Sequence, residues 1–312
     1  MIFDAHTHVF RALRGMIAAG PVTARAYGRV CAGDEEVQML PPTCEMTTFP
    51  PEVLVAEMDR AGVDKAILLQ GPFYGDQNAE VLEAVARFPD RFVGAAYLDP
   101  WAENVRAMFA SVVASGGFCA VKLECSVSTG LCGLHPEARL DAPEIAWLWT
   151  ELECNGLVTV IDLGAVGSRS YQTAAVRTIA HAHPNLKIVI AHLGQIRPAV
   201  VANPELLAQW QDQIDLGRLD NVWFDCASLP TYCAKEKYPY QSVGEFLRRA
   251  IDRIGPRKFL WGTDVPGLLG QLTYPQLVKL GMLHTKFLSN GDAAMVLGRN
   301  ALELYGHAPR TE

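Results

Sequence analysis

The chain alternates between short apolar runs and longer segments in which apolar residues recur at helical spacing. Eight runs are almost continuous in Val, Ile, Leu and Ala, at residues 2–5, 65–70, 92–98, 120–125, 157–163, 187–193, 221–226 and 258–263. Strands that are buried on both faces of a parallel sheet have this continuous pattern, whereas half-exposed strands alternate. The runs therefore predict eight parallel strands.

Amphipathic segments separate the runs and predict helices at residues 52–61, 78–88, 103–115, 144–155, 171–182, 205–216, 243–254 and 274–287. A ninth helix is predicted at residues 292–304. Eight strand-then-helix units without a linker predict one (β/α)8 TIM barrel of the α/β class, spanning residues 1–312 as a single domain. An open doubly wound sheet is the alternative, but no Gly-x-Gly-x-x-Gly follows any run.

Two connections are longer than simple turns. Residues 9–51 follow the first strand and residues 126–142 follow the fourth. Barrel enzymes build their sites at the C-terminal ends of the strands, and long loops there are commonly lids or binding loops. We expect both to be active-site loops, although packing or a contact between subunits explains residues 9–51 equally well.

Composition restricts the partners. The net charge of −7 argues against nucleic acid or an acidic membrane surface as a partner. No apolar run approaches the roughly 20 residues that cross a bilayer, and the first strand begins too early to follow a signal peptide. The eight cysteines form no Cys-x-x-Cys motif. We therefore expect reduced, mostly buried thiols in a cytoplasmic protein.

Ionisable residues gather at the predicted strand ends, where a barrel brings them to one mouth. They are His6 and His8 on the first strand, Lys122 and Glu124 on the fourth, and Asp162, His192, Asp225 and Asp264 on the last four. Residues two apart in a strand point to the same side, so His6 and His8 can bind one ion. Unpaired burial of so many such groups would be costly, and a bound cation offsets it. This pattern predicts a metal site.

Three of these strand ends resemble the amidohydrolase superfamily, and more narrowly its amidohydrolase-related branch, which includes aminocarboxymuconate-semialdehyde decarboxylase. The motifs are Asp4-Ala-His6-Thr-His8, Ile190-Ala-His192-Leu-Gly194 and Leu260-Trp-Gly-Thr-Asp264-Val-Pro266. Gly62-Val-Asp-Lys-Ala, Pro89-Asp-Arg-Phe-Val-Gly and the closing Gly298-Arg-Asn300-Ala-Leu-Glu-Leu-Tyr305-Gly are also similar to that branch. The resemblance covers nearly the whole chain and implies a barrel with one divalent metal, usually zinc.

The resemblance also implies roles for individual residues. His6 and His8 would bind the metal, and Asp264 would bind it and act as the base for the attacking water. His192 would be the catalytic acid or base. The family usually has a histidine where this chain has Asp162. We therefore expect a site of His6, His8, Asp162 and Asp264, with manganese as an alternative to zinc because carboxylates make a site harder.

Other residues are weaker candidates for binding the substrate or supporting the site: Lys122, Glu124, Asp225, Tyr74 and Arg197. Lys122 or Glu124 would serve a two-metal site in some members of the superfamily, but such sites usually need a histidine on strand five as well. A salt bridge is the plainer role for Lys122, and Glu124 as a direct metal ligand stays open. An arginine at the mouth, from Arg14, Arg29, Arg169 or Arg197, would favour a carboxylate-bearing substrate.

The function expected from these features is metal-dependent hydrolysis of a small, polar, carboxylate-bearing amide, ester or lactone by metal-activated water. One alternative, from the same branch, is a metal-dependent, non-oxidative decarboxylase of an unsaturated or aromatic acid. A second is a catalytically silent metal-binding relative, which the absent strand-five histidine keeps open. The partner would be a small molecule, and the resemblance implies a homodimer.

Overall fold

The computed structural model describes residues 1–43 and 45–306. Its main sheet has eight parallel strands in chain order: β1 (Phe3–Thr7), β6 (Lys65–Leu68), β7 (Phe92–Tyr97), β8 (Phe118–Glu124), β9 (Val158–Asp162), β10 (Ile188–Ile190), β11 (Val222–Asp225) and β12 (Phe259–Leu260). All eight predicted strands are confirmed. The near-continuous apolar runs arise because one face of each strand meets the barrel interior and the other meets the helices.

The sheet closes between β1 and the segment that follows β12. The amide of Asp264 donates to the carbonyl of His6 at 2.8 Å, and the amide of His8 donates to the carbonyl of Val265 at 2.8 Å. Asp4 adds a side-chain connection, because its buried carboxylate accepts from Thr263 Oγ1 at 2.6 Å and from Tyr274 Oη at 2.9 Å. The two ends of the strand order are therefore joined, and the sheet is a barrel.

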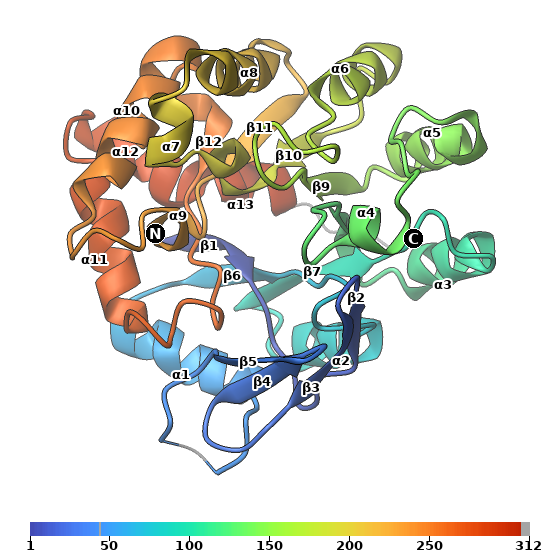
Figure 1. The fold of residues 1–312 in the computed structure, drawn as a ribbon, viewed down its shortest axis with the longest axis horizontal. Coiled ribbons are helices and arrows are strands. Elements are labelled where there is room, and N and C mark those ends of the chain that lie inside the picture. The colour runs from blue at the N-terminus through green and yellow to red at the C-terminus, as the bar shows by residue number, and fades with distance from the viewer. Residues whose placement is uncertain (44, 307–312) are drawn as a thin grey trace.

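Helices surround the strands, as Figure 1 shows. The main ones are α1 (Pro51–Ala61), α2 (Asn78–Arg87), α3 (Val105–Ser115), α5 (Ala146–Cys154), α6 (Thr173–Ala182), α8 (Pro204–Ile214), α10 (Gln241–Ile254) and α11 (Tyr274–His284). The predicted ninth helix is confirmed as α12 (Asn290–Ala294), a π-helical turn η5 (Met295–Arg299) and α13 (Asn300–Tyr305). The predicted TIM barrel is thus the fold of the chain.

The connection after β1 contains a second sheet that the hydrophobic pattern did not predict. It is antiparallel, in the order β2 (Gly15–Ile17), β3 (Gly20–Ala24), β4 (Arg29–Ala32) and β5 (Glu35–Gln38), and lies outside the ring of barrel strands (Figure 1). Val22 and Val30 are buried, but every residue of β5 is exposed. Such short, half-exposed strands have too few apolar residues to stand out in a sequence.

The connection after β8 is folded more locally. It contains the short helix α4 (Leu131–Leu134) and the 3-10 turn η1 (Pro143–Ile145) before α5 begins. Similar short helices follow other strands: α7 (Pro198–Val201) after β10, and α9 (Leu229–Tyr232) after β11. These segments position side chains at the C-terminal ends of the strands.

The interior of the barrel is apolar and closed at its N-terminal end. Phe3, Ala5, Ile67 and Val160 belong to one buried cluster with Tyr305 of α13. A larger cluster fills the layer between strands and helices. Seven cysteines lie in the described residues and all are free thiols, five of them buried, as expected; Cys44 lies outside the described residues. In the described part of the chain, no helix is both long and apolar enough to cross a membrane.

Candidate active site

The ionisable strand-end residues meet at the C-terminal mouth of the barrel. A cavity of about 660 Å³ opens there, and its wall includes His8, Lys122, Glu124, Asp162, His192 and Asp264. His6 and Asp225 are fully buried. His6 contacts Lys122 and Asp225, and Asp225 contacts His192. Six strands therefore bring their polar ends to one place, as the barrel topology predicted.

His8 is held in one tautomer by the barrel wall. Its Nδ1 lies 2.7 Å from the carbonyl oxygen of Leu69, which can only accept, so Nδ1 carries the proton. Burial lowers the pKa of His8, so the ring is neutral near pH 7. Its Nε2 therefore presents a lone pair to Asp264 Oδ1, which is 3.1 Å away.

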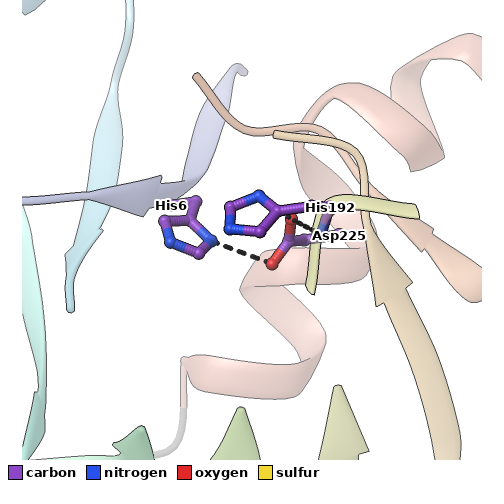
Figure 2. A group of neighbouring side chains, drawn as sticks. All are labelled: His6, His192 and Asp225. Atoms are coloured by element: carbon purple, nitrogen blue, oxygen red, sulfur yellow. Dashed lines mark hydrogen bonds and ion pairs between the residues drawn. The ribbon is translucent and has the colours of Figure 1, made fainter. Parts of the chain in front are cut away.

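His6 is oriented in the same manner by a carboxylate. Its Nδ1 lies 3.0 Å from Asp225 Oδ2, and Asp225 Oδ1 accepts the backbone amide of His192 at 2.9 Å. Figure 2 shows Asp225 reaching both His6 and His192. Burial, with the charges of Lys122 and His192, holds the pKa of His6 well below its usual value. A carboxylate that holds Nδ1 leaves Nε2 free as an acceptor, which is the usual support of a metal-binding histidine.

These tautomers create a place that needs positive charge. Nε2 of His8 and Oδ1 of Asp264 face each other as two acceptors, and Nε2 of His6 is 3.8 Å from the same oxygen. His6, His8 and Asp264 form one of two groups in the described residues whose ligand atoms lie close enough to hold a metal. Two nitrogens and one oxygen with a position left open match a catalytic divalent ion. The donor set fits a metal.

The second such group is His6, His192 and Asp225. In this group the Asp225 oxygens already accept hydrogen bonds, from His6 Nδ1 and from the amides of His192 and Ala227. Burial raises the pKa of Asp225, and these donors and the His192 charge work against that shift. Asp225 therefore holds both histidines by hydrogen bonds, and its role in supporting the site stays a prediction.

His192 and Asp162 form an ion pair beside His6, whose ring centroid lies 4.5 Å from that of His192. His192 Nε2 lies 3.4 Å from Asp162 Oδ2. Burial alone would lower the pKa of His192, but Asp162, Asp225 and Asp264 outweigh it and raise the pKa to about 9. His192 is therefore an imidazolium near pH 7. A buried cation at this point can donate a proton or stabilise a developing negative charge.

Asp162 has several partners besides His192. Its Oδ1 accepts the amide of Gly164 at 2.8 Å and Nε2 of Gln195 at 3.1 Å. Burial opposes the ionisation of Asp162, but His192 and Lys122 lower its pKa. Neither candidate metal group of the described residues includes Asp162. Its role as a fourth ligand stays a prediction, and its contacts make it the counter-ion of His192.

The backbone at His192 is strained. His192, Leu193 and Gln195 have positive φ angles of 58°, 50° and 52°, with Gly194 at 62° between them. Each non-glycine residue in this region costs about 1–2 kcal/mol. Trp210 Nε1 donates to the carbonyl of Leu193 at 2.9 Å, and the amide of His192 is held by Asp225. The surrounding structure thus holds a turn that points both His192 and Gln195 at Asp162.

The walls of the cavity carry aromatic and cationic groups. The Tyr74 ring stacks on His8 with centroids 4.3 Å apart. Arg197 lies over the Tyr232 ring, 5.4 Å from its centroid, and contacts Gln195. In the described chain the guanidinium of Arg197 has no carboxylate partner within ion-pair distance. It is therefore available to an anion.

The other arginine candidates lie elsewhere. Arg29 pairs with Glu36 in the inserted sheet, and Arg169 binds the carbonyls of Cys132 and Pro136. Arg14 does not line the cavity. Among the four candidates, only Arg197 is in the wall.

The two long connections contribute differently to the cavity. Ser126, Val127, Ser128 and Thr129 line it, and the role of residues 126–142 as an active-site loop stays a prediction. Among the described residues between 9 and 51, none is in the wall. Glu124, at the start of the lining loop, accepts the amide of Ser126, and burial together with the charge of Asp162 raises its pKa to about 7.

Sequence reasoning missed several residues of the wall, among them Gln195 and Tyr232. Gln195 follows His192 by three positions, and Tyr232 ends the short helix α9 after β11. The position of both after strand ends was a signal that could have been used. The left-handed turn that directs Gln195 inward could not be read from the residue types.

The family model for amidohydrolases matches residues 3–307, and the chain belongs to the amidohydrolase family. The family predicted from the strand-end motifs is therefore confirmed. None of the curated proteins compared with the chain matches it.

Several solved structures share the fold. An amidohydrolase from Burkholderia multivorans with bound HEPES is 18% identical, with a TM-score of 0.72 over 98% of this chain and 99% of that one. A second crystal form of that description contains zinc. A probable 2-pyrone-4,6-dicarboxylic acid hydrolase from Acinetobacter baumannii is 17% identical, with a TM-score of 0.67 over 98% and 99%. A 5-carboxyvanillate decarboxylase from Sphingomonas paucimobilis is 18% identical, with a TM-score of 0.56 over 81% and 82%.

Proposed function

We propose that the protein is a metal-dependent hydrolase that opens an ester or lactone of a small carboxylate-bearing substrate. The observation that carries this proposal is the pair of facing acceptors, His8 Nε2 and Asp264 Oδ1, with His6 Nε2 beside them. The facing acceptors of neutral histidines and an ionised carboxylate repel one another, and a bound cation relieves that repulsion. A divalent ion held there would polarise a carbonyl and lower the pKa of a bound water.

The chain's own residues supply the proton transfers. Burial works against ionisation of Asp264, but nearby positive charge, chiefly that of His192, holds its pKa far below the usual range. Asp264 is thus ionised and can orient and deprotonate an attacking water. His192, as an imidazolium, can donate to the oxygen that leaves when the ester bond breaks. Both groups line the same cavity.

Arg197 is the proposed site for the substrate carboxylate. It is half-buried in the cavity wall without a carboxylate partner in the described chain, and Tyr232 holds one face of its guanidinium. An arginine that is preorganised in this way binds a carboxylate by two parallel hydrogen bonds. The same cavity wall contains Ser126, Ser128 and Thr129, whose hydroxyl groups suit a substrate with further oxygens.

The comparisons support hydrolysis over decarboxylation. The relative described as a 2-pyrone dicarboxylic acid hydrolase acts, by that name, on a cyclic ester with two carboxylates, and it aligns along almost its whole length. The decarboxylase aligns over a smaller part of its chain and with a lower TM-score. Decarboxylation remains the second candidate because His192 is equally placed to protonate a carbanion.

The test is a panel of pyrone carboxylates, lactone carboxylates and aromatic carboxylates, assayed with the zinc- and manganese-loaded protein. Release of acid, followed by pH-stat titration, without release of carbon dioxide would support the hydrolase. Release of carbon dioxide in an amount equal to the substrate consumed would reject the hydrolase and support the decarboxylase. His192→Asn, measured on any substrate that turns over, addresses the silent-relative alternative, which predicts turnover by neither form.

A further inference from the structure

Lys122 lies beside His6, one of the residues of the candidate metal group. Its Nζ donates to Nε2 of His6 at 2.8 Å, and the side chain is almost completely buried. Nε2 has a single lone pair, because the proton of the neutral His6 ring is on Nδ1, facing Asp225. One lone pair cannot accept a hydrogen bond from Lys122 and bind a metal ion at the same time.

We propose that Lys122 and the metal exclude each other at His6, so that Lys122 sets the metal affinity of the site. This inference rests on the metal centre of the proposed function. It adds Lys122 as a residue that lowers the affinity of that centre for metal. In the metal-free protein, the Lys122 ammonium supplies the positive charge next to His6. When a metal binds His6, Lys122 turns away from it.

The cavity offers Lys122 other partners after it leaves His6. Glu124 and Asp162 line the same cavity, and the charge of Lys122 acts on both carboxyl groups. Neither is in a candidate metal group of the described residues. Metal binding would therefore move the ammonium from the buried histidine to the open part of the cavity, where a substrate carboxylate can also reach it.

The inference is tested by the dissociation constants of zinc and manganese, measured by competition with a chelator, for wild type, Lys122→Met and Arg197→Met. Methionine matches the length of lysine but cannot donate a hydrogen bond. Arg197 also lines the cavity but makes no contact with His6, so Arg197→Met controls for the loss of a positive charge. We expect Lys122→Met to bind metal about ten- to a hundredfold more tightly, and Arg197→Met to change the affinity much less.

Equal affinities of wild type and Lys122→Met would overturn the inference and leave the metal centre intact. Weaker binding by Lys122→Met would also overturn it, because Lys122 would then help to hold the ion. An equal gain in Arg197→Met would attribute the effect to charge alone and likewise overturn it. If no form binds metal, the metal centre of the proposed function fails as well. Lys122→Leu, which likewise cannot donate a hydrogen bond, replaces Lys122→Met if thermal unfolding shows that the methionine variant does not fold.

Discussion

On the β1–β12 side of the mouth, His6, His8 and Asp264 point acceptor atoms at one another. On the β9–β10 side, Asp162, His192 and Gln195 already form a complete ion pair with a hydrogen-bonding neighbour. On the first side Lys122 donates to His6, and the facing acceptors of His8 and Asp264 still need positive charge; on the second side the charges balance. The two clusters contain similar residue types but differ in function. The hydrogen-bond partners of each side chain, and not its residue type, decide which lone pairs remain available.

On the proposed function, this difference places the metal on one side and proton donation on the other. A set of free lone pairs binds a cation, whereas a buried imidazolium that is balanced by a carboxylate keeps its proton until a substrate takes it. Variants on the two sides should therefore fail in different ways. Variants on the β1–β12 side should lose the metal. Variants on the β9–β10 side should keep the metal and lose catalytic activity.

The largest effect is expected for Asp264→Asn. The amide removes the charged ligand and the base together, so we expect activity to fall by about a thousandfold or more and the bound metal to be lost. Metal content by plasma mass spectrometry and turnover on the same preparation provide the test. A variant that kept both its metal and its activity would contradict the assignment of the β1–β12 side.

His192→Asn should lower kcat by about a hundred- to a thousandfold and leave the metal content unchanged. The wild-type activity should also have an upper pH limit. Because the pKa of His192 is raised to about 9, the imidazolium is present below that pH and is lost as the pH rises through it. A pH–rate profile of kcat/KM with no decline near pH 9 would remove His192 as the proton donor.

Asp162→Ala separates the two possible roles of that residue. As the counter-ion of His192, Asp162 raises the pKa of the histidine, so the variant should keep its metal, lose about tenfold in activity and show an upper pH limit well below 9. The measurements are metal stoichiometry and the pH–rate profile, with Asp162→Asn as the closer isostere. Loss of the metal would instead establish the fourth ligand that the sequence predicted.

The smallest effect is expected for Arg197→Ala. Loss of one charge-assisted contact to a substrate carboxylate should raise KM by about tenfold, with a small change in kcat and none in metal content. Steady-state kinetics should be compared between a carboxylate substrate and its methyl ester. If the variant discriminates between the two as strongly as wild type does, Arg197 does not bind the carboxylate.

The barrel could be predicted from the sequence because its strands are buried on both sides. Each of the eight runs is too continuously apolar for a surface segment, and their spacing leaves room for one helix each. The inserted sheet could not be predicted in the same way. Its outer strand, Glu35–Gln38, is exposed throughout and depends on pairing with β4 for its structure. Pairing between distant residues leaves no local signal.

The site was predictable to the level of which residues meet, and not to the level of what each one does. Topology alone brings His8, Asp162, His192 and Asp264 to one mouth. The hydrogen bond from Lys122 to His6 and the approach of Gln195 to Asp162 depend on side-chain directions and on a left-handed turn. These contacts decide which lone pairs are free, and no residue pattern specifies them.

The closure of the barrel has a consequence for how the site is made. Asp264 is separated from His6 and His8 by more than 250 positions along the chain. They meet only when the segment after β12 pairs with β1. Long-range pairings of this kind form late in folding. Tight metal binding should therefore indicate that the barrel has closed. A chain that is still folding should not bind the ion tightly until the segment after β12 has paired with β1.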